Sequence, residues 1–201
     1  HESYKDAKGN WLYPDEIEKI DPKTVIKKSD KSKVTVGPPE SMSKSKKNTV
    51  DPETMIEQYG ADSVRWFILS DSPPEKDIQW SDNGVVSANK FLQKIWNICF
   101  LISNRKETQV DKDLENTFNA KINNYVYKID RSIEDFKFNV CVAQIYEIYN
   151  YFRDHLDNSI RNKTLSDNLI KILKLMIPFV PHLAYECLDL LKCSDKNKWP
   201  I

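Results

Sequence analysis

Apolar residues spaced three and four positions apart dominate the second half of this chain. Such spacing gathers apolar side chains on one face of an α-helix, and that face must pack against another surface. Short connections between the helices favour an antiparallel bundle. The pattern predicts four long helices with apolar positions within residues 88–102, 118–136, 141–156 and 165–176, and a last helix at 182–191 after two prolines.

The first quarter of the chain has a different texture. Residues 24–28 (TVIKK) and 33–36 (KVTV) are rich in β-branched residues and predict short strands, and Gly9-Asn10 is a turn signal. Gly37-Pro38-Pro39 then stops any regular structure. These features predict a small β-containing region at residues 1–50, so the fold class is mainly α.

Helical structure is predicted from Asp51 onward. Asp51 is a good N-cap, Pro52 suits the first helical position, and Gly60 ends this short helix. A second helix is predicted from Ala61 to about Ser70, and DIQWSDNG follows as a loop or a short extended piece. The chain thus divides into three predicted regions, which are residues 1–50, a connecting region at 51–83 and a bundle at 84–201.

Charge and cysteine content narrow the class of protein. The 30 basic and 30 acidic residues cancel, which argues against a general polyanion binder. The four cysteines include no C-x-x-C pair, so they are predicted to be reduced, mostly buried thiols of a cytosolic protein. The three histidines are scattered, so no metal site is expected. No apolar run reaches the roughly 18 residues that a membrane helix requires.

Both ends of the chain are polar or irregular. It opens on HESYKDAKGNW without an initiator Met and closes on NKWPI. These ends predict a piece of a longer polypeptide.

The most unusual segment is ESMSKSKKNTVDP, residues 40–52. Three lysines and three serines fall within residues 41–47, in a wider stretch at 22–50 that holds eight lysines against Asp30 and Glu40. Lysine is a point charge on a flexible stem, and serine hydroxyls can donate hydrogen bonds, so a loop of this kind could cover a triphosphate. Spacing alone favours a solvated linker, because charge runs usually face water. The four glycines form no phosphate-binding glycine motif.

The flanks of this segment carry a family resemblance. Met42-Ser43-Lys44-Ser45 matches the KMSKS signature of class I aminoacyl-tRNA synthetases. NTVDPETMIEQYGADSVRWFIL is similar to the segment after that signature, with the Asp-Pro, the Tyr-Gly-Ala-Asp and Arg65 in register. SPPEKDIQWSDNGVVSANKFLQKIWN, FKFNVCVAQIYEIYNYF and MIPFVPHLAYECL resemble later segments. The resemblance covers nearly the whole chain.

The residues after the signature narrow the resemblance. Ser45-Lys46-Lys47-Asn48 is similar to the bacterial and organellar leucine enzymes, whereas the isoleucine, valine and cysteine enzymes usually continue as Ser-Leu-Gly-Asn. HESYKDAKGNWLYPDEI also resembles the leucyl segment before the signature. The resemblance is therefore to bacterial-type leucyl-tRNA synthetases. It implies the end of a Rossmann-like catalytic domain followed by an anticodon-binding helical bundle.

The resemblance implies a reaction and a site. Leucine attacks ATP to give leucyl-adenylate, with Mg²⁺ sharing the phosphate charge, and the leucyl group then moves to tRNA(Leu). It implies Lys44 as the residue on the ATP phosphates, within an ATP-binding set of Ser41, Met42, Ser43, Lys44 and Ser45. Ser41 stands where the family has its first lysine. This departure either weakens loop closure or ATP affinity, or is compensated by Lys46 and Lys47.

The resemblance also implies contacts with tRNA. The candidates are Lys46 and Lys47 in the loop and Lys90, Lys94, Arg105, Arg153 and Arg161 in the bundle. A solvated polar face explains each bundle cation at least as well. Trp66, Trp80 and Trp96 could stack on bases, but Trp66 and Trp96 lie on apolar stripes, which favours core packing. His155 and His182 are expected to cap or pack.

Alternative functions remain open at the level of sequence. Another class I synthetase, for methionine, isoleucine or valine, is disfavoured by Lys46-Lys47-Asn48. A non-catalytic RNA-binding helical module is favoured only by Ser41. A helical interaction domain with no RNA role is the third possibility. The leading expectation is part of a monomeric cytoplasmic ligase that is inactive as this piece alone.

Overall fold

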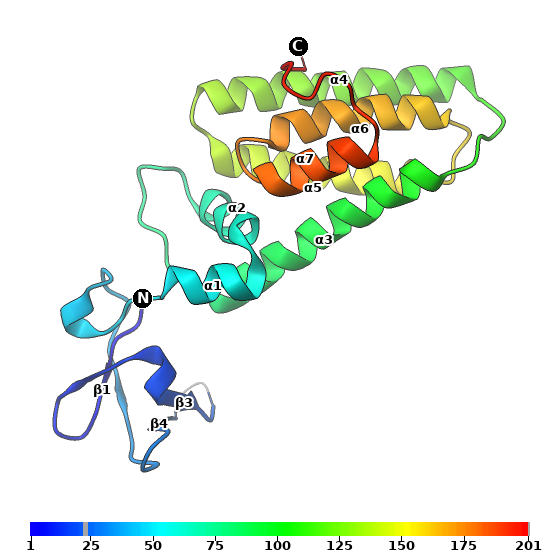
Figure 1. The fold of residues 1–201 in the computed structure, drawn as a ribbon. Helices are drawn as coiled ribbons and strands as arrows, with labels where there is room; N and C mark the ends of the chain where they lie inside the picture. Colours follow the sequence, from blue (N-terminus) through cyan, green and yellow to red (C-terminus); the bar gives the residue numbers. More distant parts are fainter. Residues whose placement is uncertain (22–23, 201) are drawn as a thin grey trace. The chain divides into compact units, whose positions relative to one another are not determined.

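The computed structural model describes residues 1–21 and 24–200 of the chain. Contacts divide the chain into two compact units, His1–Met55 and Ile56–Ile201. In Figure 1, loops and turns with a few short strands make up the first unit, and helices make up most of the second. The fold is therefore mainly α with a small β-containing part, as the sequence predicts.

The first unit holds two small antiparallel sheets. One has the strand order β2-β1-β5, with Tyr4 opposite both Leu12 and Val36, and the other pairs β3 with β4. Tyr4, Leu12, Ile17, Val25 and Val34 form its buried core. The strands are β1 (Tyr4–Lys5), β2 (Trp11–Leu12), β3 (Ile17–Lys19), β4 (Val25–Lys27) and β5 (Thr35–Val36), with 3₁₀ turns η1 (Pro14–Glu16) and η2 (Lys44–Lys46).

The local signals of the first unit are confirmed. TVIKK contains β4 and KVTV contains β5. Gly9 has a φ of +83°, and its N–H donates to the Asp6 carbonyl at 3.0 Å, which forms the turn between β1 and β2. The Asp51 carboxylate accepts hydrogen bonds from the backbone N–H groups of Glu53 and Thr54, so it caps the next helix as expected.

The second unit is a helical bundle. Figure 1 shows α3, α4, α5 and α6 running in alternating directions, which confirms the antiparallel arrangement. Its long helices bury one face each, because their apolar residues repeat at three and four. The helices are α1 (Pro52–Tyr59), which spans the division between the units, α2 (Ala61–Asp71), α3 (Asp82–Asn104), α4 (Lys112–Glu134), α5 (Phe138–His155), α6 (Asn162–Met176) and α7 (Pro181–Leu190).

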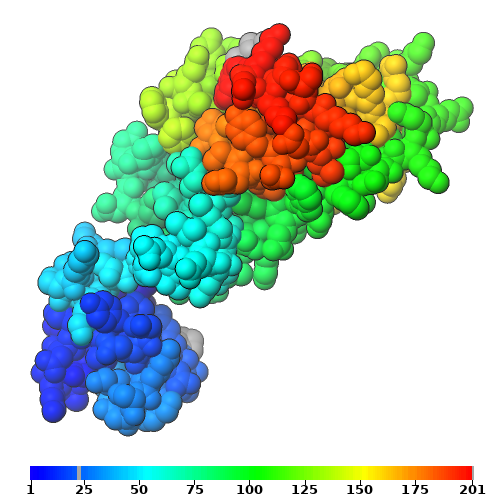
Figure 2. Space-filling view, viewed as in Figure 1, coloured from blue at the N-terminus to red at the C-terminus, as the bar shows by residue number. Residues whose placement is uncertain are grey.

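A continuous apolar core joins these helices. α4 packs on α5 and α6, α6 packs on α7, and α3 packs on α2, α6 and α7. Figure 2 shows the same side in space-filling form, where the atoms of α6, α7 and the residues after α7, in orange and red, cover much of this face of the bundle. Trp66 is only 1% exposed and stacks on Phe91 with ring centroids 5.4 Å apart, which confirms its predicted place in the core.

Two side chains of α2 hold the junction between α6 and α7. The buried Asp62 carboxylate accepts a hydrogen bond from the Leu183 N–H at 2.7 Å and contacts His182 Nδ1 at 2.9 Å, so it caps the N-terminus of α7. Arg65 donates to the carbonyls of Pro178 and Phe179 at 2.6 and 3.0 Å. The carbonyls that follow α6 and the backbone N–H group at the start of α7 therefore find their hydrogen-bond partners on α2.

The start of α3 differs from the prediction. DIQWSDNG was expected to be a loop or a short extended piece, but its last three residues are helical. α3 begins at Asp82 because the Ser81 hydroxyl caps the Gly84 N–H at 3.2 Å. Gly84 serves packing here. A Cβ at this position would lie 2.3 Å from a ring carbon of Phe67, so glycine lets α3 approach α2 closely.

Two aromatic residues assigned to buried stripes are in fact exposed. Phe136 is 65% exposed with a φ of +57°, because α4 ends at Glu134 and the chain turns there toward α5. Trp96 is 38% exposed on α3, at the margin of the stripe, so the expected core packing is wrong for it. Sequence periodicity places the edge of an apolar stripe only to within one residue on the helix surface.

All four cysteines, each within the described residues, are buried and free, which confirms their expected burial and reduced state. A hydrogen bond that the Cys99 thiol donates to the neighbouring Cys187, together with burial, raises the pKa of Cys99 far above its ordinary range, so this thiol stays protonated. Within the described part of the chain, every helix is too short or too polar for a membrane crossing.

Candidate functional site

The lysine loop, defined as residues 41–48, folds back on itself. The Lys46 N–H donates to the Ser43 carbonyl at 3.1 Å and the Lys47 N–H to the Lys44 carbonyl at 3.2 Å, forming η2. Lys47 then takes a left-handed conformation with a φ of +51°. The loop is therefore a defined turn rather than an extended linker.

Asn48 holds this turn closed from inside. Its side chain is fully buried, and its Oδ1 accepts a hydrogen bond from the Ser43 N–H at 2.8 Å. Its Nδ2 donates to the Ser41 carbonyl at 3.3 Å and the His1 carbonyl at 3.4 Å. The two ends of the loop are thus joined through one amide. The sequence placed Asn48 in the segment that continues the family signature but gave no sign of this role.

Two of the three loop lysines are held by carboxylates. Lys46 forms an ion pair with Glu40, and this pairing lowers the pKa of the Glu40 carboxyl. Lys47 Nζ lies 4.0 Å from Glu16 Oε2 and 4.8 Å from the centre of the Tyr13 ring. Lys23, one of the eight lysines counted in residues 22–50, lies outside the described residues.

Lys44 differs from its two neighbours. Its side chain is exposed, and among residues 1–21 and 24–200 it has no hydrogen-bond or ion-pair partner. The loop also presents Met42, which is 42% exposed, and the hydroxyls of Ser43 and Ser45, which lie 2.8 Å apart. The turn therefore offers one unpaired cation with hydroxyl donors beside it, which is a suitable arrangement for an anion such as phosphate.

The described residues offer no protein cage for a metal. Across residues 1–21 and 24–200, no three His, Cys, Asp or Glu side chains gather closely enough to bind one. The two carboxylates nearest the loop lysines, Glu16 and Glu40, face those lysines. A Mg²⁺ ion at the loop would need most of its ligands from substrate phosphates and water, which is common for this ion.

The arginines proposed to contact tRNA are engaged within the bundle. Arg105 donates to the carbonyls of Leu156, Asn158 and Ile160 at 2.7 to 2.9 Å, which fixes the connection between α5 and α6. Arg153 pairs with its neighbour Asp154 at 2.8 Å.

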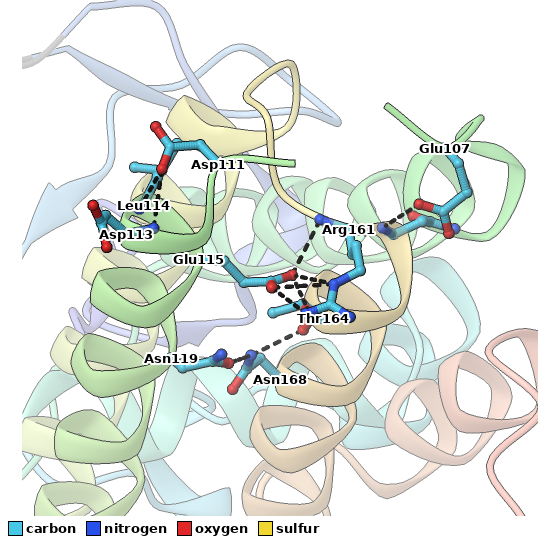
Figure 3. A network of polar contacts seen from close by, with 10 residues as sticks. Glu107, Asp111, Asp113, Leu114, Glu115, Asn119, Arg161, Thr164 and Asn168 are labelled. Atoms are coloured by element: carbon cyan, nitrogen blue, oxygen red, sulfur yellow. Dashed lines mark hydrogen bonds and ion pairs between the residues drawn. The ribbon is translucent and has the colours of Figure 1, made fainter. Parts of the chain in front are cut away.

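Arg161 belongs to a network that joins α4 to α6, shown in Figure 3. Its Nε lies 3.0 and 3.1 Å from the two carboxylate oxygens of Glu115, and the Thr164 hydroxyl donates to the same carboxylate. Asn168 donates to Asn119 one turn further along. Glu115 is only 5% exposed, and the Arg161 guanidinium lowers its pKa to about 2. This seam fixes the register of the two helices.

The remaining candidates divide by exposure. Lys90 and Lys94 are exposed on α3 and have no ion pair with any described residue. Trp80 is partly buried, and its Nε1 donates to Asp82 at 2.7 Å. His155 packs on Tyr151 and Phe118, and its Nδ1 lies 2.8 Å from the Tyr151 carbonyl. Together with the contact between His182 and Asp62, this confirms that both histidines cap or pack.

Comparison with known proteins gives the same picture along the sequence. A family model for tRNA synthetases class I (I, L, M and V) matches residues 32–81, and one for the anticodon-binding domain of tRNA ligase matches residues 115–200. The leucine–tRNA ligase of Zymomonas mobilis is 38% identical over all of this chain. That of Bartonella henselae is 39% identical, also over all of it.

The match covers only part of each relative. The chain spans 23% and 24% of the lengths of these two ligases. A solved LeuRS of Agrobacterium radiobacter, in a ternary complex with tRNA and LeuAMS, aligns with 79% of this chain and 22% of its own, at a TM-score of 0.68 and 22% identity, which shows the fold. The two family models, and the alignments that cover the whole of this chain, include both the lysine loop and the bundle that follows it. The chain therefore belongs to the class I aminoacyl-tRNA synthetases, as a member of the leucyl-tRNA synthetase family.

Proposed function

We propose that this chain is the part of a leucine–tRNA ligase that supplies the ATP-phosphate loop and a tRNA-binding bundle. The whole enzyme activates leucine with ATP to give leucyl-adenylate and transfers the leucyl group to tRNA(Leu). In this proposal residues 1–50 end the catalytic domain, 51–83 connect, and 84–201 form the bundle. A monomeric state and a cytoplasmic location are part of the proposal, and free, buried cysteines support that location.

The observation that carries the proposal is the exposed Lys44 in a turn closed by Asn48. A phosphate oxygen can meet the Lys44 ammonium without first displacing a carboxylate, whereas Lys46 and Lys47 are held by Glu40 and Glu16. Adenylate formation needs no covalent enzyme intermediate. The loop therefore acts by positioning ATP and by stabilising the charge that develops on its phosphates.

Ser41, Met42, Ser43 and Ser45 complete the proposed ATP-binding set. Ser43 and Ser45 place two hydroxyls beside Lys44, and closure of the whole turn over ATP would exclude water from the phosphates. Mg²⁺ would arrive with the nucleotide and share its negative charge.

The tRNA contacts are proposed in the order of their availability. Lys90 and Lys94 are exposed and have no ion pair among the described residues, so they support the proposal most directly. Lys46 and Lys47 could reach RNA only by leaving their carboxylates. Arg105 is the weakest candidate, because its guanidinium already holds the chain between α5 and α6.

The test is amino-acid-dependent exchange between ATP and pyrophosphate by the complete gene product. We expect exchange with leucine, and a loss of about 100-fold in Lys44→Ala, which corresponds to roughly 3 kcal/mol for one preorganised group at a transition state. Lys8→Ala is the matched control, because Lys8 is also an exposed lysine of the first unit. A Lys44→Ala rate within about threefold of wild type would remove Lys44 from the chemistry.

A second candidate function rests on Ser41. Serine in place of the family's first signature lysine favours a non-catalytic RNA-binding helical module. Absence of exchange with every amino acid, together with tRNA binding that weakens steeply as salt rises, would establish that module instead.

A further inference from the structure

The exposed side of α3 combines cations, amides and aromatic rings. This surface, the α3 face, consists of Lys90, Gln93, Lys94, Trp96, Asn97 and Phe100. Trp96 and Phe100 are one helical turn apart and are 38% and 53% exposed. Leu101, next to them, is 55% exposed. Three large apolar side chains exposed on one helix indicate a binding surface rather than a merely solvated one.

The charge on this surface has one sign. After Asp82, α3 contains no acidic residue through Asn104. With 30 acidic residues in 201, a stretch of 22 residues would carry about three. Neither Lys90 nor Lys94 pairs with a carboxylate of any described residue. The α3 face thus attracts an anionic partner and has no built-in competitor for it.

A hollow of about 340 Å³ lies along the aromatic side of this face. Asn89, Leu92, Gln93, Trp96 and Asn97 line it, together with Leu183 of α7. Its volume is at the lower end of the range for small-molecule sites. It therefore has room for a compact planar group beside the Trp96 ring.

One amide in the hollow is held in place by its neighbours. Asn89 donates to the Tyr59 carbonyl and the Ser63 hydroxyl, both at 3.1 Å, and accepts from Gln93 Nε2 at 2.8 Å. These hydrogen bonds fix the Gln93 side chain. The side-chain carbonyl oxygen of Gln93 itself has no hydrogen-bond partner among the described residues. A fixed amide beside an exposed indole can hydrogen-bond to the edge of a base whose face stacks on the ring.

We propose that the α3 face binds an unpaired RNA nucleotide. The base stacks on Trp96 or Phe100 and is hydrogen-bonded by Gln93 and Asn97, and its phosphates lie near Lys90 and Lys94. This inference rests on the proposed function, since the RNA is the tRNA substrate. α3 lies entirely between the two segments that the family models match, residues 32–81 and 115–200.

The chemistry of the face favours RNA over a protein partner. Lysine is depleted at protein interfaces, whereas aromatic rings interleaved with lysine and amide groups are what unstacked nucleotides require. Lys90 and Phe100 are separated by about 15 Å along the helix, so cations and rings lie on one short stretch. A surface that contacted only the phosphates of RNA would need no exposed rings.

The experiment measures binding of a tRNA(Leu) transcript to the complete gene product over a range of salt concentrations. We expect Trp96→Ala or Phe100→Ala to weaken binding five- to 100-fold, as for the loss of one stacked base. We expect Lys90→Gln combined with Lys94→Gln to reduce the slope of log K against log salt by one to two. Tyr127→Ala is the control, because Tyr127 is 62% exposed on α4, away from this face.

Exchange between ATP and pyrophosphate separates this inference from the proposed function, because it needs no RNA. We expect leucine-dependent exchange to be unchanged in Trp96→Ala, Phe100→Ala and Tyr127→Ala. Wild-type exchange with unaltered tRNA binding in both ring variants would overturn the α3 site and leave the proposed function intact. If Trp96→Ala and Phe100→Ala both lower the melting temperature and the exchange rate, the α3 site would also be overturned. The α3 face would then pack on another part of the protein.

Discussion

Glu115 allows the bundle's stability to be tested quantitatively. Its carboxylate, 5% exposed, accepts hydrogen bonds from Arg161 and Thr164 across the α4–α6 seam, and its pKa falls from 4.5 to about 2. One pKa unit corresponds to about 1.4 kcal/mol, so this lowering is a stabilisation of roughly 3 kcal/mol. Arg161 is 57% exposed, and solvent screening reduces the expected value to roughly 2 kcal/mol. Glu115→Gln should lose about that much at pH 7.

The pH dependence follows from the direction of the pKa change. Because the folded-state pKa lies below the ordinary value of 4.5, the carboxylate stabilises the bundle fully above pH 4.5. That contribution is lost as the pH falls toward about 2. The difference between wild type and Glu115→Gln should therefore be largest at pH 7 and shrink by more than half at pH 3.

The assay is urea unfolding followed by helical circular dichroism at both pH values. Glu134→Gln is the control, because Glu134 forms an exposed ion pair with Arg131 and should change stability by less than about 0.5 kcal/mol. An equal loss in Glu115→Gln at pH 7 and pH 3 would refute the reasoning, since the lost interaction would then not depend on ionisation.

Three further outcomes are expected. Asn48→Ala should raise the ATP KM of exchange several-fold and leave the leucine KM unchanged, because it removes the amide that joins the two ends of the lysine loop and leaves the exposed side chains of the loop unaltered. Equal effects on both KM values would contradict this expectation. Glu40→Gln should lower the ATP KM if Lys46 reaches phosphate, and an unchanged value would exclude Lys46 from the ATP site. Asp62→Ala should destabilise the bundle by about 2 kcal/mol in thermal unfolding, through loss of a buried cap, whereas a loss below about 0.5 kcal/mol would show that water replaces it.

Periodicity predicted most of the fold, and local packing decided the rest. The helices α4 to α7 follow from apolar repeats and from Pro181 at the start of α7, since both signals act within one helix. The start of α3 could not be predicted, because Asn83-Gly84 reads as a turn until Phe67 is placed against it. The exposure of Trp96 likewise depends on which neighbours reach its side of α3.

A candidate site could be proposed from the sequence, but its geometry could not be predicted. The signature resemblance pointed to Lys44, but the partners that occupy Lys46 and Lys47 depend on where the fold places Glu40 and Glu16. The role of Asn48 required the same information. Arg105 and Arg161 looked like RNA contacts because sequence does not show which carbonyls and carboxylates lie nearby.

The hydrogen bonds between α2 and the α6–α7 junction have a consequence for biosynthesis. Asp62 and Leu183 are 121 residues apart, and Arg65 and Phe179 are 114 apart. A ribosome adding about 5 to 20 residues per second needs on the order of 10 seconds to cover that distance. Throughout this interval α2 has left the exit tunnel without the partners of its two polar groups, and Trp66 lacks its edge contact with the Phe179 ring. The nascent bundle is therefore most exposed to aggregation and to chaperone capture until α7 has emerged.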